Sequence, residues 1–135
     1  MTATLSPYLN FNGNAAEAMR FYHSVLGGDL NIQTFGDAGV AQADNEKNRT
    51  LHAALISDGI TLYASDGRPD QLVKFGDNAN MSLQGNDSAV LTGYFEGLAA
   101  GGSVDMPLAK QFWGDTFGML TDKFGVHWMV NITQA

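Results

Sequence analysis

The stretch Trp113–Asn131, WGDTFGMLTDKFGVHWMVN, predicts two β-strands joined by a tight turn. Its second half alternates in side-chain character, and alternation of this kind gives a strand two unlike faces. One face, which we expect to pack in the core, holds Val126, Trp128, Val130 and Ile132. The opposite face, which we expect to line a cavity, holds His127, Met129 and Asn131. Any chemistry of this protein is to be sought on that second face.

The composition indicates one compact domain. The chain has 135 residues, of which 44% are hydrophobic, enough to bury a core of its own. Its apolar runs are far shorter than the roughly 20 residues of a membrane helix. No basic segment followed by an apolar stretch opens the sequence, so we expect no signal peptide and a cytoplasmic location. The absence of cysteine excludes disulfides, thiolate nucleophiles and zinc–thiolate sites.

The charge balance excludes another class of partner. Aspartate and glutamate number 14 and lysine and arginine 7, which gives a net charge of −7. Affinity for nucleic acid comes mainly from basic side chains that neutralise phosphates, and the basic residues here are scattered along the chain. We therefore expect no binding to nucleic acid or to anionic membranes.

The first half of the chain predicts a helix among four strands. Asn14 followed by Glu17 matches a capping box at the start of a helix over 15–26, and Gly27-Gly28 ends that helix. Asp58-Gly59 lies between two apolar runs, which is a strong hairpin signal. Strands are predicted at 5–11, 29–35, 50–56 and 60–64.

The second half repeats this order. At an offset of 72 residues, Gly13, Asn14, Tyr22 and Leu26 fall on Gly85, Asn86, Tyr94 and Leu98. A second helix would begin after Asn86 and end at Gly101-Gly102, with a strand at 104–108 and a turn at 122–125. A period of this length is too long for a solenoid and indicates a duplicated module. We predict an α+β fold of eight strands and two helices, in which the strand faces away from the helices form a cup.

Three segments carry a resemblance to a known family. YLNFNGNAAEAMRFYHSVLGG, LHAALISDGITLYASD and FWGDTFGMLTDKFGVHWMVNI closely resemble the PhnB-like branch of the vicinal oxygen chelate superfamily, which includes glyoxalase I, extradiol dioxygenases and bleomycin-resistance proteins. The resemblance implies one domain over 1–135, made of two tandem βαβββ modules at about 1–68 and 78–135. It also implies a cupped eight-stranded mixed sheet, a small-molecule ligand and a homodimer.

The resemblance also allows the metal site of that superfamily to be checked residue by residue. The ligand position of the first strand falls at or next to Pro7, and its counterpart in the second module falls on Asn80 or Ser82. The ligating glutamate of the last strand is replaced by Met129. His52 is then the only suitable side chain, whereas a catalytic metal normally needs three protein ligands. We expect no metal and no other cofactor.

The remaining candidates have two interpretations each. His52 is either a strand histidine hydrogen-bonded near Asp66, which we favour, or a substrate-binding or acid–base group. His127 and Met129 are favoured as cavity wall. Trp113 either stacks on a ligand or holds its loop in place, and the two are equally supported. The candidates for ligand contact in the cup are therefore His52, Asn80, Ser82, Trp113, His127 and Met129.

Three functions follow in order of preference. The first is a metal-independent small-molecule-binding protein of unassigned activity. The second is a divalent-metal lyase or dioxygenase with an unusual ligand set around His52. The third is a dimeric scaffold without a ligand. Some PhnB-like proteins are called ubiquinone methyltransferases, but no glycine-rich nucleotide-binding pattern occurs here, so we discount that activity.

Overall fold

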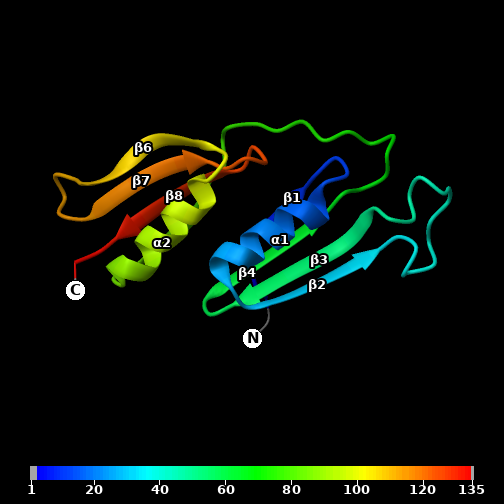
Figure 1. The fold of residues 1–135 in the computed structure, drawn as a ribbon, viewed down its shortest axis with the longest axis horizontal. Helices are drawn as coiled ribbons and strands as arrows, with labels where there is room; N and C mark the ends of the chain where they lie inside the picture. Colours follow the sequence, from blue (N-terminus) through cyan, green and yellow to red (C-terminus); the bar gives the residue numbers. More distant parts are fainter. Residues whose placement is uncertain (1–2, 135) are drawn as a thin grey trace. The chain divides into compact units, whose positions relative to one another are not determined.

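The computed structural model describes residues 3–134 (Figure 1). The chain divides into two compact units, Met1–Lys74 and Phe75–Ala135. The elements of the first unit are β1 (Tyr8–Asn10), α1 (Ala15–Leu26), β2 (Asp29–Thr34), β3 (Thr50–Ser57) and β4 (Ile60–Ser65). Those of the second unit are β5 (Met81–Gly85), α2 (Ser88–Ala99), β6 (Ser103–Lys110), β7 (Thr116–Thr121) and β8 (His127–Ile132).

Both units have the same topology. The first sheet has the strand order β1-β4-β3-β2 and the second has β5-β8-β7-β6. In each sheet the first and last strands of the unit pair in parallel, and the other neighbours pair antiparallel. This confirms the α+β class and the duplicated βαβββ modules. The eight strands form two separate four-stranded sheets and not one continuous hydrogen-bonded sheet, because no ladder joins β1–β4 to β5–β8 among the described residues.

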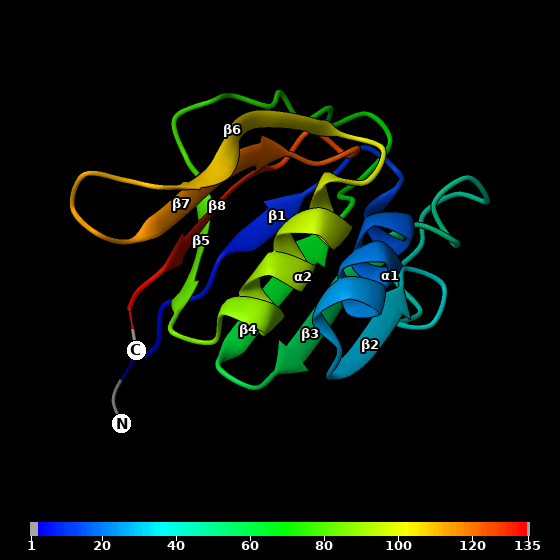
Figure 2. The ribbon, with the colours of Figure 1, turned by 60° about the vertical axis from the view of Figure 1, so that its left-hand side comes forward.

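In the first unit, α1 lies against one face of the sheet (Figure 2). The helix buries one apolar stripe of residues at helical spacing, which holds Ala15, Ala18, Met19, Tyr22 and Leu26. The helix ends where Gly27 and Gly28 both adopt positive φ. Gly28 has a second reason to be glycine, since a Cβ there would lie 2.3 Å from the carbonyl oxygen of Ile56. The predicted C-terminal stop is confirmed.

The predicted capping box is wrong. Asn14 occupies the N-cap position of α1, but its side chain makes no capping hydrogen bond. The carboxylate of Asp66 takes that role, because its Oδ1 accepts the N–H of Gly13 at 2.9 Å and of Ala15 at 2.8 Å. Its Oδ2 accepts the N–H of Thr50 at 2.9 Å. A buried carboxylate thus joins the end of β4 to the starts of α1 and β3.

The second helix also begins differently from the prediction. Asp87, not Asn86, is the N-cap of α2, and its carboxylate accepts the N–H of Val90 at 3.2 Å. The helix buries Leu91, Phe95 and Leu98. Phe95 packs on β7 beside Gly118, where a Cβ would lie 2.8 Å from the phenyl ring. Close contact between α2 and its sheet therefore depends on a glycine at this position.

The turn before β8 is built around Asp122, as the repeat predicts. Its Oδ1 accepts the N–H groups of Phe124 and Val126, at 2.8 Å and 3.1 Å. Its Oδ2 accepts Nε1–H of the buried Trp128 at 2.8 Å. The turn carboxylate therefore also satisfies the one polar group of the largest core side chain.

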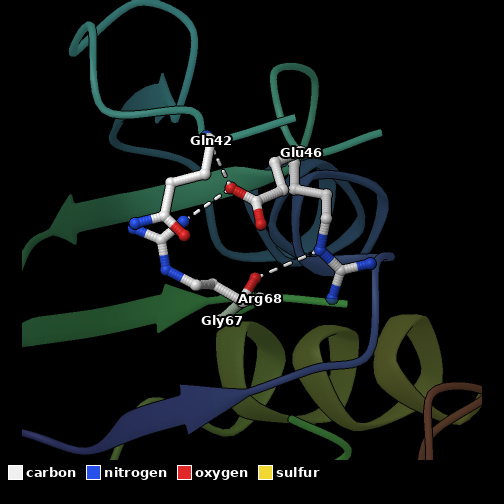
Figure 3. Close-up of polar contacts among 5 residues, drawn as sticks. Gln42, Glu46, Gly67 and Arg68 are labelled. Atoms are coloured by element: carbon white, nitrogen blue, oxygen red, sulfur yellow. Dashed lines mark hydrogen bonds and ion pairs between the residues drawn. The ribbon is translucent and has the colours of Figure 1, made fainter. Parts of the chain in front are cut away.

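The long loop between β2 and β3 is attached to the unit by Glu46 (Figure 3). The buried carboxylate of Glu46 accepts the N–H of Gln42 at 2.9 Å and pairs with Arg68 at 2.5 Å. The guanidinium of Arg68 also lies 5.0 Å from the ring centre of Phe35. Beside this pair, Arg49 donates through Nε to the carbonyl of Gly67 at 3.1 Å.

No helix among residues 3–134 combines the length and the apolar character that crossing a membrane requires.

Candidate functional site

Each sheet has one face turned away from its helix, which we call the open face. On the open face of the first sheet, Tyr8 of β1 lies beside Tyr63 of β4 in the parallel register. His52 of β3 is exposed on the same face, with its ring centre 5.7 Å from that of Tyr8 and 5.4 Å from that of Tyr63. We call Tyr8, His52 and Tyr63 the ring cluster.

A hydrogen bond orients His52 within the ring cluster. Its Nδ1 lies 3.0 Å from the hydroxyl of Tyr8. The predicted neighbour, Asp66, is occupied by three backbone N–H groups instead, so that part of the prediction is wrong. Among residues 3–134, Nε2 of His52 has no hydrogen-bond partner. One imidazole nitrogen is therefore hydrogen-bonded to Tyr8, and the other is available to a ligand.

On the second sheet, the two predicted faces of β8 are confirmed. Val126, which precedes the strand, and the strand residues Trp128, Val130 and Ile132 are buried. His127, Met129 and Asn131 are half-buried on the open face. Their neighbours on the adjacent strands are Ser82, Gln84, Phe117, Met119 and Thr121.

Three polar side chains cross the open face of the second sheet in a row. Nδ1 of His127 lies 2.9 Å from Oγ1 of Thr121, and that hydroxyl donates to Oδ2 of Asp105 at 2.7 Å. The second carboxylate oxygen of Asp105 accepts from the hydroxyl of Ser103 at 3.3 Å. Among the described residues, Nε2 of His127 has no hydrogen-bond partner.

The strand register places the remaining candidates. Ser82 lies on β5 directly opposite Met129, and its hydroxyl is 3.4 Å from Oε1 of Gln84. Asn80 is exposed and precedes β5. Trp113 lies in the loop between β6 and β7 and is 49% exposed, with ring contacts to Phe112 and Phe117. These contacts support neither interpretation of Trp113 over the other.

The donor set at the strand pairs does not fit a catalytic divalent metal. Tyr8, next to Pro7, lies opposite Tyr63, and Ser82 lies opposite Met129. Phenol, hydroxyl and thioether groups are poor ligands for divalent transition metals, which prefer imidazole or carboxylate. Within residues 3–134 no group of three or more His, Asp or Glu side chains is placed to hold a metal ion.

A cavity of about 450 Å³ lies in the second unit, near the start of α2. Most side chains that line it are polar, and they are Asn86, Ser88, Lys110, Thr116, Thr133 and Gln134. No local pattern predicted this cavity, because its walls come from α2, β6, β7, β8 and the two residues that follow β8.

Four further side chains on the open faces were not predicted from the sequence: Tyr8, Tyr63, Asp105 and Thr121. A signal for Tyr63 was present, since the alternation in ITLYAS places it opposite the buried Leu62 and Ala64. Its proximity to Tyr8 follows only from the parallel pairing of β1 with β4.

The fold is the one found in proteins of the glyoxalase/bleomycin resistance/dioxygenase type. A structure of a protein of this type from Burkholderia phytofirmans has 12% sequence identity to this chain and a TM-score of 0.63, over 93% of this chain and 96% of the other. The chain belongs to the PhnB-like family, because the family model described as 3-demethylubiquinone-9 3-methyltransferase matches residues 3–131.

Two other solved structures are similar over nearly the whole chain. Protein PA1353 from Pseudomonas aeruginosa is 41% identical, with a TM-score of 0.89, over 99% of this chain and 100% of that one. The PhnB protein from Bacillus cereus is 23% identical, with a TM-score of 0.78, over 97% of this chain and 100% of that one. The paired βαβββ modules are therefore shared with these proteins.

Proposed function

We propose that this protein binds a small organic molecule on its open faces and does so without the metal centre of the glyoxalase-type enzymes. The ring cluster is the observation that carries the proposal. Three rings lie with centres 5.4 to 6.0 Å apart on one sheet face, and Tyr8 is 47% exposed. Aromatic surface left open beside an oriented hydrogen-bonding group is typical of ligand sites.

The chemistry of the ring cluster indicates the kind of ligand. The faces of Tyr8 and Tyr63 favour a planar or apolar group. Nε2 of His52 offers one hydrogen bond, as donor or acceptor according to the tautomer. A ring or short apolar chain that carries one polar group fits both features.

Native mass spectrometry of the untagged protein, incubated with a cytoplasmic metabolite extract and then desalted, tests this proposal. The wild type should retain a compound of defined mass, and His52→Ala and Tyr63→Leu should each reduce its occupancy at least tenfold. His23→Ala, which removes an exposed imidazole from α1, is the matched control and should retain the compound. Retention of nothing by the wild type, or equal retention by all four proteins, would contradict the proposal.

A metal-dependent lyase or dioxygenase built around His52 is the second candidate, and the available Nε2 of that residue favours it. Elemental analysis of the untagged protein separates the two. One equivalent of a divalent metal in the wild type, lost in His52→Ala, would replace the metal-independent proposal. Much less than one equivalent of metal in both proteins would support the metal-independent proposal.

We also propose that the protein is a cytoplasmic homodimer. β6 is an edge strand of the second sheet, and Val104 and Met106 on it are 48% and 41% exposed. Exposed apolar side chains on a sheet edge are typical of surfaces that pair with another chain.

A further inference from the structure

The hydrogen bonds along the row Asp105–Thr121–His127 determine which ring nitrogen of His127 carries a hydrogen. A carboxylate only accepts hydrogen bonds, so the single hydroxyl proton of Thr121 points to Asp105, 2.7 Å away. The oxygen of Thr121 then faces Nδ1 of His127 as an acceptor, at 2.9 Å. A close contact between two acceptors would be repulsive, so Nδ1 must carry a hydrogen. In the neutral imidazole, Nε2 is then without a proton.

A β-bulge places Asp105 for this role. On β6, Val104 pairs with Leu120 and Met106 pairs with Met119, so Asp105 is an extra residue without a cross-strand partner of its own. Thr121 pairs directly with Ser103 on one side and with His127 on the other. Bulges often re-aim a side chain in this way. The three strands lie side by side in both ribbon views (Figures 1 and 2).

We infer that Asp105 and Thr121 are positioning residues that hold the neutral ring of His127 with its proton on Nδ1, so that Nε2 is a hydrogen-bond acceptor on the open face of the second sheet. The group bound there must then be a donor, such as a hydroxyl, an amide N–H or an ammonium. Met129, two residues after His127 on the same face of β8, pairs with Met119 of β7. These two side chains add apolar surface next to His127. This second binding position therefore takes a hydrogen-bond donor, and it is independent of the ring cluster on the first sheet.

Long-range ¹H–¹⁵N correlation spectra of the ¹⁵N-labelled protein, recorded where imidazoles are neutral, test the inference. The two tautomers give different cross-peak patterns, and the three histidines are assigned with His23→Ala, His52→Ala and His127→Ala. His127 should show the pattern with the proton on Nδ1. Thr121→Val should shift most of the population to the other tautomer, and Thr121→Ser, which restores the hydroxyl, should return it. Asp105→Leu should act like Thr121→Val.

Two results would overturn the inference. One is a wild-type spectrum in which His127 carries its proton on Nε2. The other is an unchanged pattern in Thr121→Val, with backbone spectra that show the variant to be folded. If Thr121→Val fails to fold, Asp105→Leu decides alone, because Asp105 is exposed and its replacement leaves the core intact. A missing ligand in the mass-spectrometry experiment would leave this result unaffected, so the two proposals fail separately.

Discussion

The carboxylate of Asp66 accepts the backbone N–H of Ala15, the first residue of α1, across 51 residues of sequence. Asp66 follows β4, and the same side chain also binds the N–H of Gly13 and of Thr50. A single buried carboxylate therefore caps the helix and joins it to two strands. Its neighbour in sequence, Ser65, lies at the end of β4, the strand that carries Tyr63 of the ring cluster.

Asp66→Ala should lower the free energy of unfolding by about 3 kcal/mol, because three N–H groups lose a charged acceptor and two of those bonds are buried. Urea unfolding followed by circular dichroism measures the change. Asp44→Ala, at an exposed loop position, is the control and should change stability by less than about 0.5 kcal/mol. Equal effects of the two substitutions would show that the cap contributes nothing.

Gly118→Ala should destabilise the protein by about 1 to 3 kcal/mol, since the added methyl group overpacks a filled site. The new Cβ would lie 2.8 Å from the Phe95 ring and 3.0 Å from backbone atoms of Met106 and Leu108. Gly93→Ala is the matched control, because nothing lies within 4 Å of a Cβ at that position of α2. It should raise stability by about 0.5 to 1 kcal/mol through helix propensity. Thermal unfolding of both variants should therefore shift in opposite directions.

Glu46→Ala should loosen the loop between β2 and β3 while changing global stability by no more than about 1 kcal/mol, since the Arg68 side chain is 29% exposed and solvent screens the pair. Hydrogen exchange measured by mass spectrometry should accelerate in peptides from residues 36–49 and stay unchanged in peptides from β7 and β8. Lys47→Ala, next to Glu46 but exposed, should leave the loop peptides as in the wild type. Uniform acceleration in every peptide would instead indicate a loss of global stability.

Val104→Lys and Met106→Lys should shift the protein from dimer to monomer in sedimentation velocity experiments, because each places a charge on the exposed edge strand β6. Val90→Lys is the control: Val90 is 44% exposed, but it lies on α2. It should leave the distribution unchanged. A monomeric wild type would contradict the proposed dimer. A dimer that persists in both variants would show that the contact is not on β6.

Local patterns in the sequence were sufficient to predict most of the elements. Alternation along β8 predicted which side chains are buried, since successive residues of a strand point to opposite faces whatever surrounds them. The C-terminal end of α1 and the turn at Asp58-Gly59 follow from residues within a few positions of each other. The cap at the start of α1 does not, because Asp66 supplies it from 51 residues away. The repeat predicted that both units share one topology. These features depend on backbone geometry over short distances.

The candidate site depends on contacts that no local pattern contains. His52 lies beside Tyr8 because β1 and β3 both pair with β4, which brings together residues 44 positions apart. His127 is linked to Asp105 only through the register of three strands and one bulge. Sequence alone determined the family, the faces and the turns of this protein. The tertiary structure decided which side chains meet on those faces, because strand register and bulges set distances between residues that are remote in the chain.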